Sequence, residues 1–239
     1  MIALCFSKRT GFMKKLVTTF STACLLLSAV AWADINENTV SYAMGFKTGQ
    51  AMKAQSITVN TQRFSQGLQD GYTGKQPSVS EADMQTALTN MQKKVIQNMQ
   101  QQSQAAAEKN EQEGQAFLAK NAKLPGVVTT ASGLQYKIID QGNGNSPTAN
   151  DTVTVNYEGT LINGTVFDSS YQRKTPATFR VGAVIKGWQE ALTLMKPGAT
   201  WMLYIPSNLA YGKQGAAGAI GPNETLLFKV NLISVKSVG

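Results

Sequence analysis

The sequence predicts an α+β protein, in which an all-α N-terminal region is joined by a long helix to an antiparallel β-sheet wrapped on one short helix. Two observations support this prediction. The composition changes near residue 123, from a segment rich in Gln, Ala, Met and Asn to one rich in Gly, Pro, Val, Thr and aromatic residues. The hydrophobic pattern changes with it, from helical spacing to the alternation of half-buried strands.

Residues 1–33 are predicted to be a signal peptide that is removed on export. Lys14 and Lys15 precede an apolar segment over residues 16–30, and Ala31 and Ala33 provide the small residues of a cleavage site. A transmembrane anchor, the alternative, needs about 20 apolar residues, and this run is shorter and interrupted by Thr and Ser. Translation starts at Met1 or at Met13.

The composition of the 239-residue chain excludes several kinds of chemistry. Histidine is absent, which excludes Ser-His-Asp and Cys-His catalysis and zinc sites that need imidazole. Both cysteines, Cys5 and Cys24, lie in the signal segment, so the exported chain has no thiol. This distribution fits a protein of the periplasm, outer membrane or cell surface of a Gram-negative bacterium. The net charge falls from +8 to +4 without residues 1–33, so we expect no nucleic-acid partner.

Residues 34–79 are predicted to form two short helices with apolar faces. Asn60 and Ser41 are candidate N-caps. A segment this short cannot bury a core that outweighs the entropy of the chain. We therefore expect a dimerisation region in which a second copy packs against five apolar side chains: Tyr42, Met44, Phe46, Met52 and Phe64. Docking on the second half of the same chain is the alternative.

A long connecting helix is predicted over residues 80–122, with Ser80 and Asp83 in a capping box at its start. An apolar stripe follows at spacings of three and four residues: Met84, Leu88, Met91, Val95 and Met99. The stripe is either a packing or dimer seam or an adaptable surface for unfolded clients. Residues 100–115 are polar on every face, which is typical of a helix that bridges domains; a disordered linker is the alternative.

Residues 123–239 are predicted to form the antiparallel sheet. The strands are expected over residues 134–138, 153–157, 201–205 and 225–235, with a hairpin over 160–167. Asn163-Gly164 suits a type I′ turn in that hairpin. One helix over residues 185–195 ends before Pro197-Gly198. The glycine-rich segment 212–221 lacks the features of a phosphate-binding loop, and we expect neither cofactor nor metal.

Five motifs in residues 123–239 carry a resemblance to a known family. They are 153–157 (VTVNY), 164–170 (GTVFDSS), 184–188 (VIKGW), 209–212 (LAYG) and 225–228 (TLLF). In this order they resemble the FKBP-type peptidyl-prolyl cis-trans isomerases. The chain after residue 33 is similar to the macrophage infectivity potentiator group, which are exported bacterial members with an N-terminal helical dimerisation region and a long connecting helix.

The resemblance implies an enzyme that accelerates rotation about X-Pro bonds in exported proteins and assists their folding. Resonance in the C–N bond makes such rotation slow, at tens to hundreds of seconds for X-Pro. Neither nucleophile nor general base is needed, because an apolar pocket favours the twisted amide, which is less dipolar than the planar one. The implied partners are proline-containing polypeptides, a second copy of the chain, and macrolide-type inhibitors.

The family's pocket residues correspond to positions of this chain that the motifs align. Four are expected to act in catalysis: Asp168, Tyr211, Trp188 and Phe228. The others are expected to bind substrate: Tyr157, Phe167, Arg173, Phe179, Val184, Ile185 and Ile220. Trp188 is expected to form the floor below the proline ring. The N–H of Ile185 and the hydroxyl of Tyr211 are expected to hold substrate carbonyls. Asp168 is expected to orient the twisted carbonyl, held by Arg173 and Tyr157.

The chain departs from the family pattern at the pocket rim, at Ala177, Ala216 and Ala219. These small residues are expected to change macrolide affinity and the preference for the residue before proline. A rival interpretation is a holdase-type chaperone that uses the dimer cleft, with the isomerase module as a proline-binding surface. A third, a virulence-associated binding protein, rests on the group resemblance alone.

Overall fold

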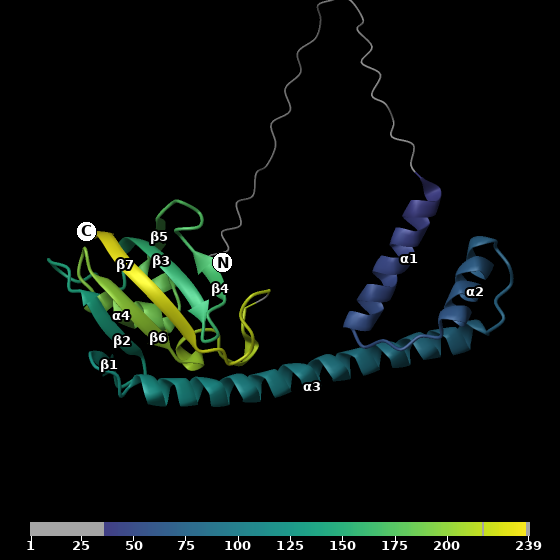
Figure 1. Cartoon of the computed structure of the whole chain (residues 1–239), viewed down its shortest axis with the longest axis horizontal. Helices are drawn as coiled ribbons and strands as arrows, with labels where there is room; N and C mark the ends of the chain where they lie inside the picture. The colour runs from purple at the N-terminus through teal and green to yellow at the C-terminus, as the bar shows by residue number, and fades with distance from the viewer. Residues whose placement is uncertain (1–35, 217, 238–239) are drawn as a thin grey trace, which may run out of the picture. The chain divides into compact units, whose positions relative to one another are not determined.

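The computed structural model describes residues 36–216 and 218–237. They divide into two compact units, residues 36–100 (the helical unit) and residues 101–237 (the sheet unit). Figure 1 shows helices alone in the first unit, and a β-sheet with a short helix and the last part of a long helix in the second. The predicted α+β fold class is confirmed. The predicted signal peptide lies outside the described residues, and the domain boundaries after residues 79 and 122 stay predictions.

The helical unit begins with α1 (Glu37–Ala54) and α2 (Thr61–Tyr72). Each starts at an asparagine whose side-chain oxygen accepts a hydrogen bond from a backbone N–H three residues later, at 3.0 Å. Asn60 caps α2 as predicted. The prediction of Ser41 as a cap was wrong, because Asn36 caps α1 and places Ser41 inside the helix.

Helix α3 (Glu81–Asn121) runs without interruption from one unit into the other. Ser80 caps its start: the Ser80 hydroxyl accepts from the Asp83 N–H at 3.1 Å and donates to the Asp83 carboxylate at 2.7 Å. The polar segment 100–115 is helical, so the linker alternative is wrong. Among the described residues, every helix falls short of the length and apolarity that a membrane crossing requires.

The described part of the sheet unit contains seven antiparallel strands. They are β1 (Val127–Thr129), β2 (Gln135–Asp140), β3 (Thr152–Leu161), β4 (Val166–Ser169), β5 (Ala177–Arg180), β6 (Thr200–Ile205) and β7 (Leu226–Lys236). Their order is β1-β2-β6-β7-β3-β4, and β5 also pairs with β3. The sequence analysis missed β1 and β5, which are too short for an alternating pattern to stand out.

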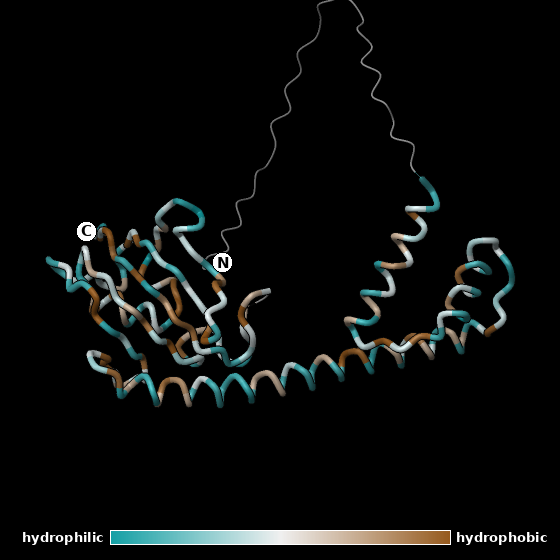
Figure 2. Tube along the Cα trace, in the orientation of Figure 1, coloured by the Kyte–Doolittle hydropathy of each residue, from teal (hydrophilic) through white to brown (hydrophobic). Residues whose placement is uncertain are grey.

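One face of the sheet and helix α4 (Lys186–Leu194) enclose the core. Strand β3 alternates buried and partly buried residues along its whole length, and β6 and most of β7 do the same. The single-turn 3-10 helices η1 (Val181–Ala183), η2 (Ser207–Leu209) and η3 (Gly212–Gln214) connect the strands and α4. Figure 2 shows hydrophobic segments along the strands and mostly hydrophilic ones along the part of α3 that follows residue 100.

The hairpin between β3 and β4 forms where it was predicted but with another turn. A type I′ turn needs positive φ at both central residues. Only Gly164 has it, at +85°, and Asn163 does not. The Gly164 N–H donates to the Leu161 carbonyl at 3.0 Å and the Leu161 N–H to the Thr165 carbonyl at 2.9 Å. This is the three-residue loop in which a type I turn is followed by a left-handed residue.

Within the helical unit, every described side chain is at least partly exposed. The predicted dimer face shows this most clearly, with Tyr42 73% and Met44 67% exposed. The rings of Tyr42 and Phe46 stack at 6.0 Å on the surface of α1. These helices therefore have caps and hydrogen bonds but no hydrophobic core of their own among the described residues.

Candidate functional site

A fully buried tryptophan, Trp188, lies at the centre of an aromatic cluster in the sheet unit. It is placed by the first turn of α4, where Gly187 allows close packing, since a Cβ there would lie 2.5 Å from Ile205. The edges of three rings meet Trp188 near 90°: Tyr157 and Phe228 at 5.2 Å between centroids, and Phe179 at 6.0 Å. Edge-to-face contacts of this kind are the favoured aromatic geometry.

The indole N–H of Trp188 is buried and has no hydrogen-bond partner among the described residues; the same holds for Trp201. A buried donor without a partner costs free energy, so each case needs a reason. Trp188 is surrounded by the rings of Phe179, Phe228 and Tyr157, and the Tyr157 hydroxyl is already bonded to Asp168 and Arg173. The base of the cluster is therefore strongly apolar.

Gly159 permits the second pair of rings, Phe167 and Phe228, which meet at 5.4 Å and 87°. A Cβ at Gly159 would lie 2.6 Å from Phe228 and 2.7 Å from Phe167. The sequence analysis missed this residue. The signal was a glycine at a position where the alternation of β3 calls for an apolar side chain.

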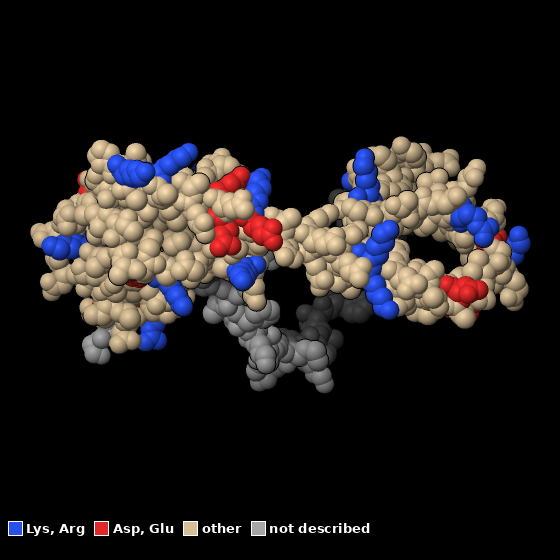
Figure 3. All heavy atoms as spheres, turned by 90° about the horizontal axis from the view of Figure 1, so that it is seen from below, with Lys and Arg blue, Asp and Glu red and all other residues tan. Residues whose placement is uncertain are grey.

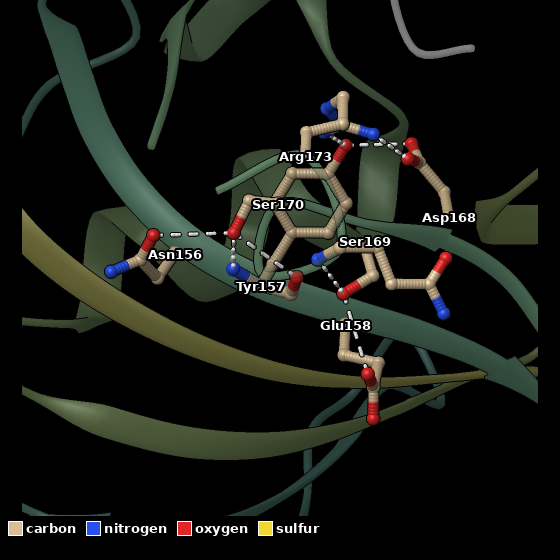
Figure 4. Close-up of polar contacts among 8 residues, drawn as sticks. Asn156, Tyr157, Glu158, Asp168, Ser169, Ser170 and Arg173 are labelled. Carbon is tan, nitrogen blue, oxygen red and sulfur yellow. Dashed lines mark hydrogen bonds and ion pairs between the residues drawn. The ribbon is translucent and has the colours of Figure 1, made fainter. Parts of the chain in front are cut away.

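A polar triad, in which Tyr157 and Asp168 are buried and Arg173 is exposed, extends from Tyr157 of the aromatic cluster, and Figure 4 shows its contacts. The Tyr157 hydroxyl donates to one oxygen of Asp168 at 2.6 Å and accepts from the Arg173 guanidinium at 2.7 Å. Arg173 donates to the other oxygen of Asp168 and forms an ion pair with it. Asp168 is only 8% exposed, so its carboxylate is held by charge-assisted hydrogen bonds away from bulk water.

The backbone of β4 and the turn after it fixes Asp168 against β3. Asp168 pairs with Gly159 in the register of the two strands. The Ser170 N–H donates to the Tyr157 carbonyl, and the Tyr157 N–H donates to the Ser170 hydroxyl, both at 2.9 Å. Ser170 also donates to the Asn156 side chain at 3.2 Å. The sequence analysis quoted Ser170 within a motif but gave it no role.

The triad shifts the pKa of each member. Burial, and then the hydrogen bond to Asp168, raise the pKa of Tyr157 to about 12. Burial alone would raise the pKa of Asp168, but the hydrogen bonds from Tyr157 and Arg173 outweigh it, so this pKa lies below its ordinary value. The same bonds raise the pKa of Arg173. At neutral pH the carboxylate is therefore ionised and the phenol protonated.

The remaining predicted residues belong to the hydrophobic core of the sheet unit, which contains the aromatic cluster. Val184 and Ile220 are buried in this core, and Ile185 and Tyr211 are partly buried against it. Burial, together with the nearby negative charge of Asp168, raises the pKa of Tyr211. The nine predicted apolar and aromatic positions therefore belong to this core or pack against it, and their common role as a pocket stays a prediction. Of the rim alanines, Ala177 and Ala216 pack against the core, whereas Ala219 is exposed.

The described residues can also be searched for a metal site and for a concentration of positive charge. They contain no group of three His, Cys, Asp or Glu side chains placed to hold a metal ion. On the face seen in Figure 3, Lys and Arg side chains lie in small separate groups. The aromatic cluster and its polar triad are thus the arrangement on which we base a chemical function.

Comparisons with known proteins agree with this arrangement. Residues 144–233 match the family described as "FKBP-type peptidyl-prolyl cis-trans isomerase", and residues 37–138 match the "Domain amino terminal to FKBP-type peptidyl-prolyl isomerase". The first match contains every predicted pocket residue. The second covers the described helices of the helical unit, all of α3, and strand β1.

Several whole proteins are similar over nearly their full length. The chain is 53% identical to the peptidyl-prolyl cis-trans isomerase Mip of Coxiella burnetii, over 94% of this chain and 99% of that protein. It is 45% identical to the outer membrane protein MIP of Legionella longbeachae, over 93% and 97%. The crystal structure of FkpA from Escherichia coli superposes with a TM-score of 0.71 at 36% identity, over 86% of this chain and 99% of FkpA.

Proposed function

This chain belongs to the FKBP-type peptidyl-prolyl cis-trans isomerases, and we propose that the aromatic cluster around Trp188 and the triad of Asp168 form its active site. The observation that carries the proposal is the hydrogen bond from Tyr157 of the buried aromatic cluster to the fixed carboxylate of Asp168. The substrates proposed are proline-containing polypeptides.

The pocket acts by favouring the twisted amide. In the planar amide, resonance places partial charges on oxygen and nitrogen. Water solvates these charges, and rings such as Trp188 and Phe228 do not. The twisted amide has lost this resonance and is less dipolar. The free-energy cost of transfer from water into the apolar pocket is therefore smaller for the twisted amide than for the planar amide. The barrier to rotation therefore falls without covalent chemistry.

Polar groups at the rim orient the substrate. Asp168 supplies a fixed negative charge, because Tyr157 and Arg173 hold both of its oxygens. A preorganised charge of this kind costs no reorganisation during the reaction. The Tyr211 hydroxyl, protonated at neutral pH, is available to donate to a substrate carbonyl. We assign to the backbone N–H of Ile185 a hydrogen bond to a second carbonyl of the substrate.

The test is a protease-coupled isomerisation assay on a short X-Pro peptide with residues 34–239. Asp168→Asn should lower kcat/KM by about 10- to 100-fold through misplacement of the reacting amide. Asp151→Asn is the matched control, because Asp151 is also buried and accepts hydrogen bonds from Thr148, away from the aromatic cluster. Trp188→Phe should lower kcat/KM, whereas Trp201→Phe, which also removes a buried unpaired indole N–H, should not. Equal losses in each pair would contradict the proposed site.

A second part of the proposal concerns the helical unit, which we assign to homodimerisation. The supporting observation is the exposure of apolar side chains on α1: Tyr42 and Phe46 stack on one side of the helix, and these two residues and Met44 are all more than half exposed. Exposed apolar surface of this kind is typical of an interaction surface. The alternative function is a holdase-type chaperone that binds unfolded clients in the dimer cleft. The sequence similarity to an outer membrane protein and the signal segment also support export across the inner membrane.

Sedimentation tests whether the helical unit forms a dimer. The wild-type protein should sediment as a dimer, and Tyr42→Ser with Phe46→Ser should produce a monomer with unchanged activity on a short peptide. Lys47→Ser is the exposed control on the same helix. A monomeric wild type would contradict the assignment of the helical unit to homodimerisation. Export is tested by N-terminal sequencing of the mature protein, which should begin at Asp34.

A further inference from the structure

The last part of α3 is hydrogen-bonded to the segment that leads into β7. The Asn223 side-chain amide donates to the Ala107 carbonyl at 3.3 Å and to the Glu111 carboxylate at 3.2 Å. In the opposite direction, the Asn110 amide donates to the Pro222 carbonyl at 2.9 Å. All these residues belong to the sheet unit. Asn223 is only 7% exposed, so its bonds to α3 are shielded from water.

Close packing accompanies these hydrogen bonds one turn further along α3. Gly114 is buried, and a Cβ there would lie 2.4 Å from the Thr225 hydroxyl oxygen and 3.4 Å from the Thr225 Cβ. A glycine inside a helix costs helical stability. Its place here is explained by this approach of the helix to residue 225.

The same asparagine also contacts the segment that carries a proposed active-site residue. The Asn223 backbone N–H donates to the Gly212 carbonyl at 2.8 Å. Gly212 directly follows Tyr211 in the chain, and Tyr211 packs against the hydrophobic core that contains the aromatic cluster. Asn223 has a φ of +54°, in the left-handed region. This conformation lets its N–H face Gly212 while its side chain faces α3.

We propose that Asn223 is a positioning residue for the isomerase reaction, which fixes Tyr211 by joining the Gly212 backbone to α3. This inference rests on the role of Tyr211 given above. It makes residues 107–114 of α3 a structural support of the active site. A purely structural Asn223 would stabilise the fold and leave the reaction rate of the folded enzyme unchanged.

Asn223→Gly tests the side-chain bonds separately from the backbone. Glycine adopts positive φ without strain and keeps the N–H that reaches Gly212, so only the bonds to α3 are lost. We expect kcat/KM on the short peptide to fall by about tenfold, less than the about hundredfold that a 1 Å misplacement can cost. Glu111→Ala should give a smaller loss in the same direction. Gln112→Ala, at the exposed neighbouring position, is the control and should have no effect.

A double-mutant cycle with Tyr211→Phe separates positioning from structure. If Asn223 acts through Tyr211, Asn223→Gly should cause little further loss in the Tyr211→Phe background. If the two losses multiply, or if Asn223→Gly alone has no effect, the inference is overturned while Tyr211 keeps its role. If Tyr211→Phe has no effect, the proposed role of Tyr211 fails, and the inference fails with it.

Gly114→Ala provides an independent test of the same support. The added methyl group meets the Thr225 hydroxyl and should push the helix away from residues 221–225, lowering kcat/KM. Thr225→Ala removes the hydroxyl oxygen that the new methyl group contacts, so the double variant should recover most of the lost activity. Loss without recovery, or no loss in a folded Gly114→Ala protein, would contradict the proposal.

Discussion

The two units differ in where they place their aromatic side chains. The sheet unit buries large aromatic side chains around Trp188, whereas the helical unit exposes the stacked rings of Tyr42 and Phe46. Burial of apolar surface is the main favourable contribution to folding. The sheet unit therefore has its own source of stability and can hold a fixed site, and the helical unit depends on a further surface. The same residue types are therefore buried in one unit and exposed in the other, depending on what packs against them.

The largest expected difference between the units is in the cost of removing a leucine. Leu203 is fully buried in β6, so Leu203→Ala should lower the free energy of unfolding of the sheet unit by about 2–5 kcal/mol. Leu68 on α2 is 67% exposed, so Leu68→Ala should change the free energy of unfolding of the helical unit by less than about 0.5 kcal/mol. Urea denaturation measures both, followed by tryptophan fluorescence for the sheet unit and by helical circular dichroism for the helical unit. Equal effects would remove the distinction drawn between the units.

Replacing a glycine by alanine should destabilise the sheet unit and stabilise the helical unit. Gly159→Ala forces a Cβ against the rings of Phe167 and Phe228 and should cost about 1–3 kcal/mol of stability, with reduced kcat/KM. Gly45 lies in α1, where an added Cβ would meet nothing within 4 Å, so Gly45→Ala should stabilise the helix by about 1 kcal/mol. Thermal melting by circular dichroism compares them. A destabilising Gly45→Ala would indicate that the partner surface approaches this glycine closely.

The smallest expected effect is a pH dependence that belongs to the sheet unit. The lowered pKa of Asp168 contributes stability that is present at neutral pH and is lost in acid, below about its ordinary value of 3.8. The raised pKa of Tyr157 contributes stability that is complete below pH 10 and is lost as the pH rises toward about 12.

Thermal melts across pH measure these contributions. The Tm of Tyr157→Phe should decline less steeply than that of wild type between about pH 10 and 12, and the Tm of Asp168→Asn less steeply in acid. Between about pH 5 and 9, catalysis should not change through either group, because Asp168 stays ionised and Tyr157 protonated. Parallel slopes for variant and wild type would show that the triad does not contribute as described.

Much of the fold could be predicted because its signals are local. The caps at Asn60 and Ser80, the period of α4 and the alternation of β3 each lie within a few neighbouring residues. The strands β1 and β5 were missed because three or four residues cannot show a pattern. The turn at Asn163-Gly164 was misjudged because the register of β3 and β4, which has a bulge beside it, selects the loop.

The sequence by itself determined the two-part architecture and the family, because the order and spacing of the motifs can be read along the chain; the pocket positions that it predicts rest on the same motifs. Tertiary structure decided what those positions contact. The need for glycine at 159 and 114 depends on rings and hydroxyls that lie far away in the chain. The bonds of Asn223 to α3 join residues more than 110 positions apart. Such contacts exist only once packing has brought the elements together, and no local pattern encodes them.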